Sequence, residues 1–592
     1  MSNKSNDKLP LIETDVLIVG TGPAGASASA LLATYGIDNM VVNKFAWTCR
    51  TPRAHITNQR TVEVLRDLGV EQDCLDLATP QELMGENTFA ASLAGEEIAR
   101  VLAWGMPPAR KADYELSSPA KIFDLPQHLL EPILTRTAAH RGSKVRFNTE
   151  YISFEQDDDG VTTTLLDLIT QQKFQVRSKY LLGADGGNSK IAEDAALPME
   201  GEMGMAGSMN IVFEADLSKY VEHRPSLLYW LIQPGGELAG LGIPLIRMVR
   251  PWNKWLCIWG YDINEGAPDL TDDEAKKVLH QLIGDDQIPI HIDSTSTWTV
   301  NSMYALKNTK GRIFCLGDAV HRHTPMNGLG SNTSIQDAFN LAWKLALVIK
   351  GKANPSLLES YNDERIPVGE QIVKRATKSL GDLGPIMEAL GLVGEDSPEQ
   401  MIQNIAKRKL NIPEAEAQRE KLRQAVEDTQ YIFNCHGVEM NMRYESAAVV
   451  PDGSPDEEFK RDRELYHQAS SRPGAMVPHV WLIDPQQQKV STVDICGNGQ
   501  FSLITGLGGE EQWASALADI EKVNGLTVNL RIIGPGQQYE DIYGDFARVR
   551  DISETGALLV RPDNIIAWRA QEASADTAKD LVAAMQKILG KV

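Results

Sequence analysis

Short apolar runs that end in glycine, each followed by a helical pattern, mark two places in the chain. Residues 15–19 (DVLIV) lead directly into GTGPAG at 20–25, and small and apolar residues then recur at helical spacing to residue 35. Residues 311–316 (GRIFCL) lead in the same way into a second glycine-rich segment at 317–332, which opens a long helical pattern ending near residue 351. Both units predict a strand, a tight turn and a helix, and they favour an α/β fold.

Residues 204–298 show a different pattern, in which short apolar runs alternate with polar ones. Residues 226–232 (SLLYWLI) and 254–261 (KWLCIWGY) are examples. Such runs indicate antiparallel strands, so we expect a separate sheet between the two glycine-rich units. Its tryptophans and tyrosines can enclose a planar aromatic ligand, although packing in the core is the commoner role for any single one of them.

The last third of the chain divides into two further patterns. Residues 381–475 mix charged helical runs with breaks such as 450–455 (VPDGSP), whereas 476–592 alternate strands such as 501–504 and 528–533 with a helix near 513–522. A chain of 592 residues exceeds one hydrophobic core, and roughly three to four domains are expected.

Composition narrows the class of protein. The chain is 42% hydrophobic and 23% charged, as in ordinary globular proteins, and no apolar run approaches the ~20 residues that span a bilayer. Its formal charge of −22 argues against nucleic acid and against anionic membranes as partners. The six cysteines are scattered without a CxxC pair, and the first nine residues lack the apolar core of a secretion signal. We therefore expect a cytoplasmic protein.

The first glycine-rich segment carries the clearest chemistry. Gly20 permits a sharp reversal, Gly22 lets a pyrophosphate approach the backbone, and Gly25 lets helix and strand pack closely. Pro23 and Ala24 begin the helix, whose free N–H groups and positive end then face the phosphates. A purely structural turn is the alternative. Two such segments far apart in the chain are best explained by one long cofactor, which we predict to be FAD.

Further residues are expected at the same cofactor. Asn43 stands where an acidic residue normally holds a ribose hydroxyl, and an amide can make that bond without charge assistance. Asp318, at the end of the second strand, can accept hydrogen bonds from a polyol, or it caps a loop. The helix that follows can place its N-terminus against the flavin ring. The residues expected there are Pro325, Gly328, Gly330, Ser331 and Asn332.

His321 and His323 flank Arg322 and invite a metal-site interpretation. Two histidines without nearby acidic or thiolate ligands do not complete a coordination sphere. We therefore expect no metal, and we place these histidines along the flavin loop.

These motifs, together with Asp185 in YLLGADGGNS at 180–189, resemble the FAD-dependent aromatic monooxygenases of the para-hydroxybenzoate hydroxylase and phenol hydroxylase type. The resemblance covers about residues 12–380. One position departs from the pattern, because Ala192 stands where an arginine usually follows the serine, which bears on how a nicotinamide is gripped. Residues 51–66 and the C-terminal part look closer still to the chlorophenol hydroxylases.

Residues 51–66 read as a loop followed by a helix that Thr57 can cap. The resemblance places Arg53 near the flavin and lets Gln127 approach it from a helix, and we add Tyr151 to the cofactor contacts. His55 falls where a phenol hydroxylase carries an acidic residue thought to deprotonate the substrate hydroxyl, so we predict it to be the base. Arg53 and Pro325 complete the predicted catalytic group. The alternatives are a surface cation for Arg53 and an ordinary loop residue for His55.

The resemblance also implies the architecture. It predicts a Rossmann-like FAD-binding domain at 12–203 and 299–380, with an interleaved α+β substrate domain at 204–298. A helical connector and dimer contact is expected at 381–475, and a thioredoxin-like domain without CxxC at 476–592. Residues 1–11 are expected to form a disordered tail.

The function implied is that of an NAD(P)H- and FAD-dependent monooxygenase. In this family a flavin C4a-hydroperoxide delivers one oxygen atom of O2 ortho to the hydroxyl of a phenol, here a chlorophenol that becomes a catechol. We expect a homodimer or homotetramer with a small phenolic substrate. Resorcinols, hydroxybenzoates and polycyclic phenols stay open as substrates. A flavin dehydrogenase or oxidase without oxygen transfer and a flavin-binding module without turnover are the rival functions.

Overall fold

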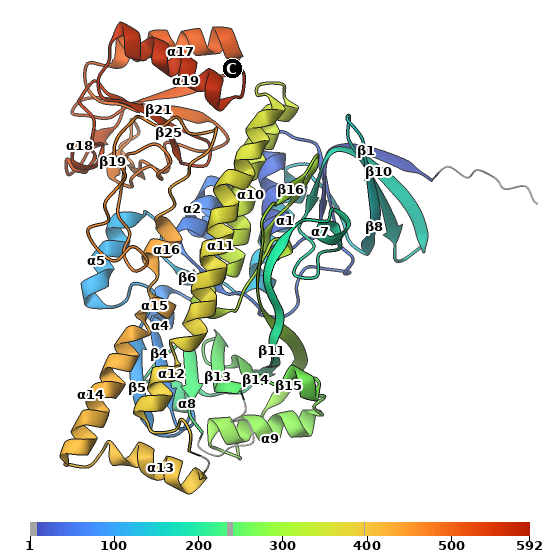
Figure 1. The fold of residues 1–592 in the computed structure, drawn as a ribbon, viewed down its shortest axis with the longest axis vertical. Coiled ribbons are helices and arrows are strands. Elements are labelled where there is room, and N and C mark those ends of the chain that lie inside the picture. Colours follow the sequence, from blue (N-terminus) through green and yellow to red (C-terminus); the bar gives the residue numbers. More distant parts are fainter. Residues whose placement is uncertain (1–8, 234–240, 396) are drawn as a thin grey trace, which may run out of the picture.

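The computed structural model describes residues 9–233, 241–395 and 397–592 (Figure 1). Residues 1–8 of the expected tail lie outside the described residues. Leu11, which we assigned to that tail, is instead the first residue of strand β1 (Leu11–Val19). The correction has a simple cause, because Leu11 and its neighbours pair in register with Gln175 and the residues that follow it.

A mainly parallel sheet forms the first layer of the molecule. Its path is β16 (Thr309–Lys310), β17 (Ile313–Cys315), β10 (Gln172–Gly183), β1, β2 (Asn39–Val42) and β7 (Lys144–Arg146). The strands from β17 to β7 are parallel, and a hairpin of β8 (Thr149–Gln156) and β9 (Val161–Asp167) joins β10 antiparallel. Helices α1 (Pro23–Thr34), α6 (Gln127–His140) and α10 (Gly330–Ile349) share one apolar core on its helical side.

The parallel order explains why distant motifs meet. Because parallel strands end at the same edge, the residues that follow β1, β2, β10 and β17 are brought together there. Gly20, Asn43, Asp185 and Gly317 all stand just past those ends. The N–H of Gly20 donates to the carbonyl of Val42 at 2.8 Å, which fixes the first turn against the next strand.

A second, mostly antiparallel sheet forms the lower part of Figure 1. Its order is β18 (His321–Arg322), β15 (His291–Ala305), β11 (Met199–Glu214), β14 (Lys254–Tyr261), β13 (Leu241–Arg250), β12 (Leu228–Leu231), β4 (Glu86–Ala90) and β5 (Glu97–Leu102). The sheet is therefore wider than the range 204–298 that we predicted, since residues 86–102 supply one edge. β11 and β15 are also longer, and they run up to the first sheet.

The two faces of the second sheet differ. Ile211, Trp255 and Cys257 point to one face and share an apolar core with Leu279 and Leu282 of α9 (Asp272–Ile283). Val212 and Leu256 point to the other face and form a small separate cluster with Val249. The second face is the one that turns toward the residues discussed below.

Helices from the predicted connector cover the far edge of this sheet. α12 (Gly384–Ala389), α13 (Pro398–Lys407) and α14 (Pro413–Asp428) pack into the same core through Ile386, Ile405 and Leu422. The region at 381–475 is thus more than a linker between folded parts. Its role as a dimer contact stays a prediction.

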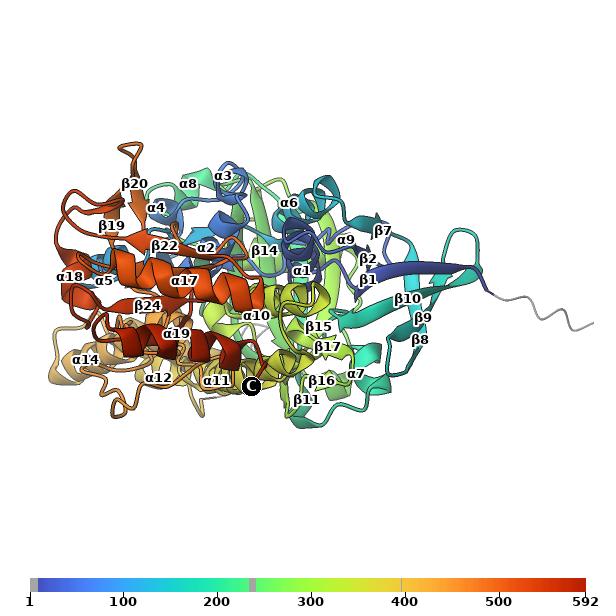
Figure 2. The same ribbon diagram turned by 90° about the horizontal axis from the view of Figure 1, so that it is seen from above.

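The C-terminal part has the pairing of a thioredoxin-like fold. Strand β21 (Phe501–Thr505) runs parallel to β22 (Val528–Ile532) and antiparallel to β24 (Ala557–Val560), which pairs with β25 (Ile566–Ala570). Helices α17 (Glu510–Asn524) and α19 (Ala575–Ile588) complete this βαβ and ββα arrangement. Figures 1 and 2 show this part on the left and the β8–β9 hairpin of the first sheet on the right, with α10 between them.

Candidate active site

The glycine turn after β1 shows which glycines the fold itself requires. Gly20 has φ +106°, and a Cβ on it would lie 2.1 Å from the carbonyl oxygen of Ala184. A Cβ on Gly25 would lie 2.0 Å from the carbonyl oxygen of Gly20, so α1 can approach β1 only with glycine here. The predicted packing role of Gly25 is confirmed. These two residues shape the turn, whatever binds beside it.

Gly22 is different, because neither backbone nor packing requires it. Its φ and ψ of −66° and −179° suit any residue, and a Cβ on it would lie 3.9 Å from Oε1 of Glu131, an ordinary contact distance. Pro23 opens α1, and no side chain caps that helix. An open glycine at an uncapped helix N-terminus is the arrangement that a pyrophosphate needs, so this turn fits FAD.

The polar residues at the edge of the first sheet differ in whether their side chains are already hydrogen-bonded to the protein. Asn43 Nδ2 donates to the hydroxyl of Thr21, so its amide is held toward the glycine turn. Asp185 accepts from the Ser189 hydroxyl at 2.5 Å and from the Ile191 N–H at 3.2 Å, and burial raises its pKa. Asp318 is exposed, and its carboxylate has no hydrogen bond within the described residues. Asp318 is thus the carboxylate best placed to accept bonds from a polyol.

The second glycine-rich segment is tied to the loop that carries His55. Asn332 is buried, and its amide donates to the Ile56 carbonyl at 2.8 Å and accepts from the Asn58 N–H at 3.0 Å. Gly328 has φ +65° and packs against Ile56. Pro325 is exposed, while Gly330 and Ser331 are half-buried at the start of α10. The side chain of Asn332 is therefore occupied by hydrogen bonds to protein groups, and it ties α10 to the loop that carries His55.

His55 is held by two very short strands. β3 (Ile56–Thr57) pairs with β6 (Phe123–Asp124), and the Leu125 N–H donates to the His55 carbonyl at 2.8 Å. This pairing brings Asp124 to His55, whose Nδ1 lies 2.8 Å from the carboxylate Oδ2. Because an ionised carboxylate can only accept, Nδ1 carries the proton and Nε2 keeps its lone pair. Nε2 has no hydrogen bond within the described residues.

Arg247 closes the group from the second sheet. Its guanidinium is buried and donates to the carbonyl oxygens of Arg53 and Pro52, each at 2.7 Å. Burial, and then the charge of Arg247, lower the pKa of His55 below its usual value, while Asp124 acts in the opposite direction. Burial lowers the pKa of Arg247 itself to about 10. A neutral histidine is therefore poised as a base at neutral pH.

Several polar atoms around this group lack partners. Oδ1 of Asp124, Nε of Arg247 and Nδ1 of His128 are buried without a hydrogen bond within the described residues. Burial lowers the pKa of His128 to about 4. Unpaired polar atoms of this kind are uncommon in native proteins, and their concentration around His55 indicates a place where a ligand or water belongs.

Of the other predicted site residues, Gln127 and Arg53 lie near His55, whereas Tyr151 does not. Gln127 begins α6, and its amide donates to Glu131 at 2.5 Å, while its N–H donates to the Ala54 carbonyl beside His55. Arg53 is exposed, as the surface-cation alternative for it assumed, and it belongs to the loop that also carries His55. Tyr151 lies apart on β8, where its hydroxyl donates to Asp194 at 2.7 Å. The structure does not bring Tyr151 to the His55 group.

The flavin-loop histidines bind protein groups. His321 is buried and bonds Asp337 at 2.7 Å through Nε2, and Nδ1 of His323 bonds the Thr324 carbonyl at 2.6 Å. Throughout residues 9–233, 241–395 and 397–592, no three His, Cys, Asp or Glu side chains gather as a metal-binding group. Over the same residues, no helix is long and apolar enough to cross a bilayer.

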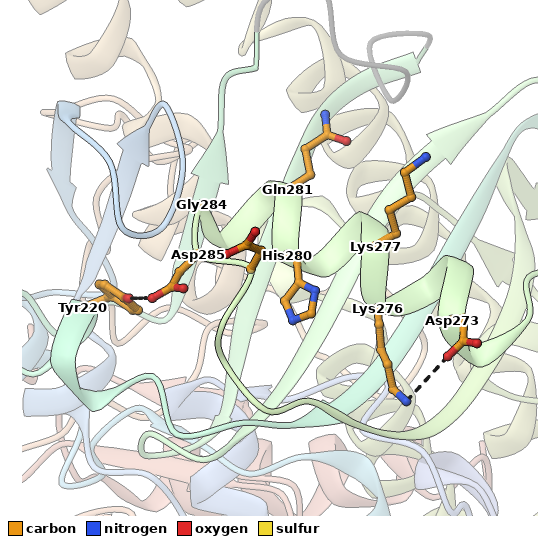
Figure 3. Close-up of a pocket in the computed structure, with 9 residues that line it drawn as sticks. Tyr220, Asp273, Lys276, Lys277, His280, Gln281, Gly284 and Asp285 are labelled. Carbon is orange, nitrogen blue, oxygen red and sulfur yellow. Dashed lines mark hydrogen bonds and ion pairs between the residues drawn. The ribbon is translucent and has the colours of Figure 1, made fainter.

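An open depression of about 810 Å³ lies elsewhere, on the outer surface of α9 (Figure 3). Its sides include the ion pair of Lys276 with Asp273 and the hydrogen bond from Tyr220 to Asp285. Because α9 covers the face of the sheet opposite Arg247, this depression is separate from the His55 group. We assign it no part in the chemistry.

Sequence reasoning missed two members of the His55 group, Asp124 and Arg247. Asp124 gave no pattern, because strands of two residues are too short for any period to show. Arg247 did give a signal, since it is a lone cation in the apolar run IPLIRMV of β13. A buried cation in a strand needs partners, and such a residue marks a site.

Comparison with known proteins adds the family. A family model described as FAD binding domain matches residues 13–376, and one described as aromatic-ring hydroxylase, C-terminal, matches residues 470–592. The chain is 59% identical to a 2,4-dichlorophenol 6-monooxygenase of Delftia acidovorans, over 99% of both chains. It is 46% identical to a phenol 2-monooxygenase of a Pseudomonas species, over 96% of this chain and 91% of the relative. A solved flavin-dependent monooxygenase, PieE in complex with FAD and substrate, superposes with a TM-score of 0.94 at 41% identity, covering 98% of this chain and 100% of that one.

Proposed function

This chain belongs to the FAD-binding aromatic-ring hydroxylases, and on that premise we propose that it adds one oxygen atom to a phenol, specifically a chlorophenol, ortho to its hydroxyl. The names of both curated relatives support a phenolic substrate, and the higher identity to the dichlorophenol enzyme supports chlorine on the ring. NAD(P)H is the electron donor typical of such hydroxylases.

The observation that carries the proposal is the His55–Asp124 pair with its free Nε2. When bound, FAD would supply the redox chemistry, which is hydride acceptance from NAD(P)H and activation of O2. The residues that would hold it are the Gly22 turn for the pyrophosphate, Asp318 for the polyol chain and the start of α10 for the ring. The protein's own part in the reaction is proton transfer and positioning.

We assign His55 the role of base. Nε2 takes the proton of the substrate hydroxyl, and the Asp124 carboxylate 2.8 Å from Nδ1 stabilises the imidazolium that results. The phenolate has more electron density at its ortho carbon than the phenol, so it is the better nucleophile. Arg247, buried beside the loop, favours the phenolate by its positive charge. Electron-withdrawing chlorines make the hydroxyl more acidic, and a weak base is then sufficient.

The first experiment replaces this base. We expect His55→Ala to lower the hydroxylation rate by about 10² to 10⁴-fold near pH 6, because the positioned base that takes the proton is lost. The loss shrinks toward pH 9, where the chlorophenol ionises by itself. Stopped reactions with 2,4-dichlorophenol, analysed by mass spectrometry for a gain of one oxygen, measure the effect.

The controls separate chemistry from folding. FAD retention on a desalting column stays unchanged in His55→Ala, since His55 holds no predicted FAD contact. His291→Ala replaces an exposed histidine of the second sheet and keeps the wild-type rate. A pH–rate profile that is unchanged in His55→Ala excludes His55 as the base, and a wild type that yields no oxygenated phenol refutes the function itself.

We further propose that the protein is cytoplasmic and forms a homodimer or homotetramer. Its six cysteines are free thiols, five of them buried, which suits a reducing compartment. Val393, Ile402 and Leu410 are exposed on and beside α13, at 63%, 57% and 51% of their surface, which supports a subunit contact in the connector region. Light scattering of the wild type and of Ile402→Lys tests this contact, since the charged variant should dissociate.

A further inference from the structure

Asn87 has a fully buried side chain with no hydrogen-bond partner in the described part of the chain. Both Nδ2 and Oδ1 are unpaired. Burying an amide in this way costs about 1–3 kcal/mol for each group left unsatisfied. A buried amide that destabilises the fold in this way and makes no hydrogen bond to the protein is a candidate for contact with a ligand.

The register of the second sheet shows where this amide points. Asn87 on β4 pairs with Leu228 on β12, and Leu228 pairs with Arg247 on β13. Residues paired across neighbouring strands point to the same face, so Asn87 and Arg247 share a face. Two strand spacings, about 10 Å, separate them. Arg247 reaches the Pro52 and Arg53 carbonyls from that face, and Asn87 therefore lies on the sheet wall opposite the His55 loop.

A second unpaired donor lies beside Asn87. Trp230 follows Leu228, the partner of Asn87, by two positions on β12, so its side chain points to the same face. Its indole Nε1 is buried without a hydrogen-bond partner in the described residues. Its ring stacks with Phe89, with centroids 6.1 Å apart and an interplanar angle of 17°. The wall thus combines flat apolar rings with unpaired polar atoms, as sites for aromatic ligands do.

We propose that Asn87 is a specificity-determining residue, whose amide, with Trp230 Nε1 beside it, hydrogen-bonds a second hydroxyl on the aromatic substrate. This rests on the proposed function, because it assumes that the phenol lies between this wall and His55. An amide with a free NH2 and a free carbonyl oxygen is matched by a hydroxyl, which both donates and accepts. Chlorine or methyl leaves Oδ1 unpaired. The substrate class is therefore phenols that bear a second hydroxyl, in addition to chlorophenols.

The test compares two ligands of similar size, resorcinol and 3-methylphenol, which differ in a hydroxyl against a methyl. Each is titrated into the oxidised holoenzyme, and the change in flavin absorbance gives Kd without turnover. In Asn87→Leu, which is close in shape to asparagine, we expect resorcinol to bind about 10-fold more weakly and 3-methylphenol to stay within about twofold. Equal changes for both ligands, or none, overturn the proposal.

Thr88→Val is the matched control. Thr88 neighbours Asn87 on β4 but points to the other face, where its hydroxyl lies 2.7 Å from that of Ser226. Its replacement leaves the ratio of the two Kd values as in the wild type. If Asn87→Leu yields no holoenzyme, Asn87→Ser, which keeps one polar atom, supports the proposal by an intermediate ratio and overturns it by an unchanged one.

A second readout is stability without ligand. Because Asn87→Leu removes two unpaired polar groups, the thermal midpoint of the ligand-free holoenzyme stays equal or rises. A fall of several degrees means that the amide has a structural partner such as a buried water, and this overturns the proposal. If the wild type binds both ligands but oxygenates no phenol, 2,4-dichlorophenol included, the proposed function fails, while the Kd ratio still decides the role of Asn87.

Discussion

Two buried groups of charged residues differ in whether their hydrogen bonds are complete. The loop cluster consists of His55, Asp124 and Arg247. The docking cluster consists of Lys344, Glu364, Arg561 and Asp563, where α10 and α11 (Ser360–Gly381) meet the C-terminal part. Each cluster brings together residues that are far apart in the sequence.

The docking cluster leaves no atom unpaired among the described residues. Arg561 donates to both oxygens of Glu364, at 2.5 and 2.9 Å, and to both oxygens of Asp563. Lys344 donates to Glu364 at 2.8 Å and to Asn340 at 2.8 Å. The side chains of Lys344, Glu364 and Arg561 are 0% exposed. Since each charged side chain of this network is hydrogen-bonded to other protein groups, its role is to hold the C-terminal part on α10 and α11.

In the loop cluster the hydrogen bonds are incomplete. Oδ1 of Asp124 and Nε of Arg247 are unpaired, and Nε2 of His55 is free within the described residues. The contrast teaches that burial of charge does not by itself identify a functional site. What identifies it is a buried polar group whose partners are missing, because such a group awaits a molecule that binds there.

The largest expected effect comes from breaking the docking cluster. Arg561→Met leaves Glu364 and Asp563 buried without their shared cation, and we expect a loss of about 3–5 kcal/mol in unfolding free energy. Urea unfolding followed by tryptophan fluorescence measures it. The exposed pair of Arg548 and Asp545 provides the control, since Arg548→Met should cost under about 1 kcal/mol.

A double variant sharpens this result. In Arg561→Met with Glu364→Gln, the second change removes the charge that the first one stranded, so the combined loss is smaller than the sum of the single losses. Strict additivity shows that the two residues do not form one network. A loss under about 1 kcal/mol for Arg561→Met alone shows that the cluster does not hold the C-terminal part.

Much of the fold could be predicted because its signals are periodic. The apolar runs before Gly20 and Gly317 form strands β1 and β17, which end at the same sheet edge. The alternating residues at 226–232 and 254–261 contain strands β12 and β14. Residues 86–90 could not be assigned to the second sheet, because four of the five are buried and show no alternation. The predicted helix cap at Thr57 was wrong by one residue. The next residue, Asn58, is also a good capping residue, and its side chain accepts from the Thr61 N–H.

The candidate site was predictable only in part, for a physical reason. His55, Arg53 and Gln127 lie in loops or at a helix start near one another, and the family resemblance placed them. Asp124 and Arg247 join them through tertiary pairing, which no local pattern encodes. Asn332 as a cofactor contact stays a prediction, and what no local pattern indicated is that its side chain links α10 to the His55 loop.

A smaller effect is expected from changing one charge in the loop cluster. Asp124→Asn keeps a polar group near Nδ1 but removes the negative charge that stabilises the imidazolium, and we expect the hydroxylation rate to fall about 10 to 100-fold. FAD binding and the urea midpoint change little, because the docking cluster is untouched. Asp285→Asn, just after the end of α9 at Ile283, is the control and keeps the wild-type rate. A rate within twofold of wild type in Asp124→Asn removes Asp124 from the mechanism.

The smallest effect is a difference in acid response between the two clusters. Although burial alone would raise it, Arg561 and Lys344 hold the pKa of Glu364 well below its ordinary value. Stability from a carboxylate with a lowered pKa is present above the unfolded pKa, near 4.5, and is lost as pH falls below it. Between pH 8 and pH 5 the docking cluster therefore stays intact, and tryptophan fluorescence should stay constant.

Activity should change over the same interval, because it follows His55. Burial lowers the pKa of His55 below its usual 6.5, so the acid limb of the rate profile has its half-point below pH 6.5. Asp124 acts to raise that pKa, and Asp124→Asn should therefore move the half-point further toward acid while lowering the maximum. Steady-state rates at intervals of about half a pH unit resolve the change, since one lost carboxylate shifts a neighbouring pKa by about one or more. A half-point above 6.5 contradicts the assignment of the acid limb to His55. A half-point that moves together with the fluorescence shows that the two clusters titrate as one unit.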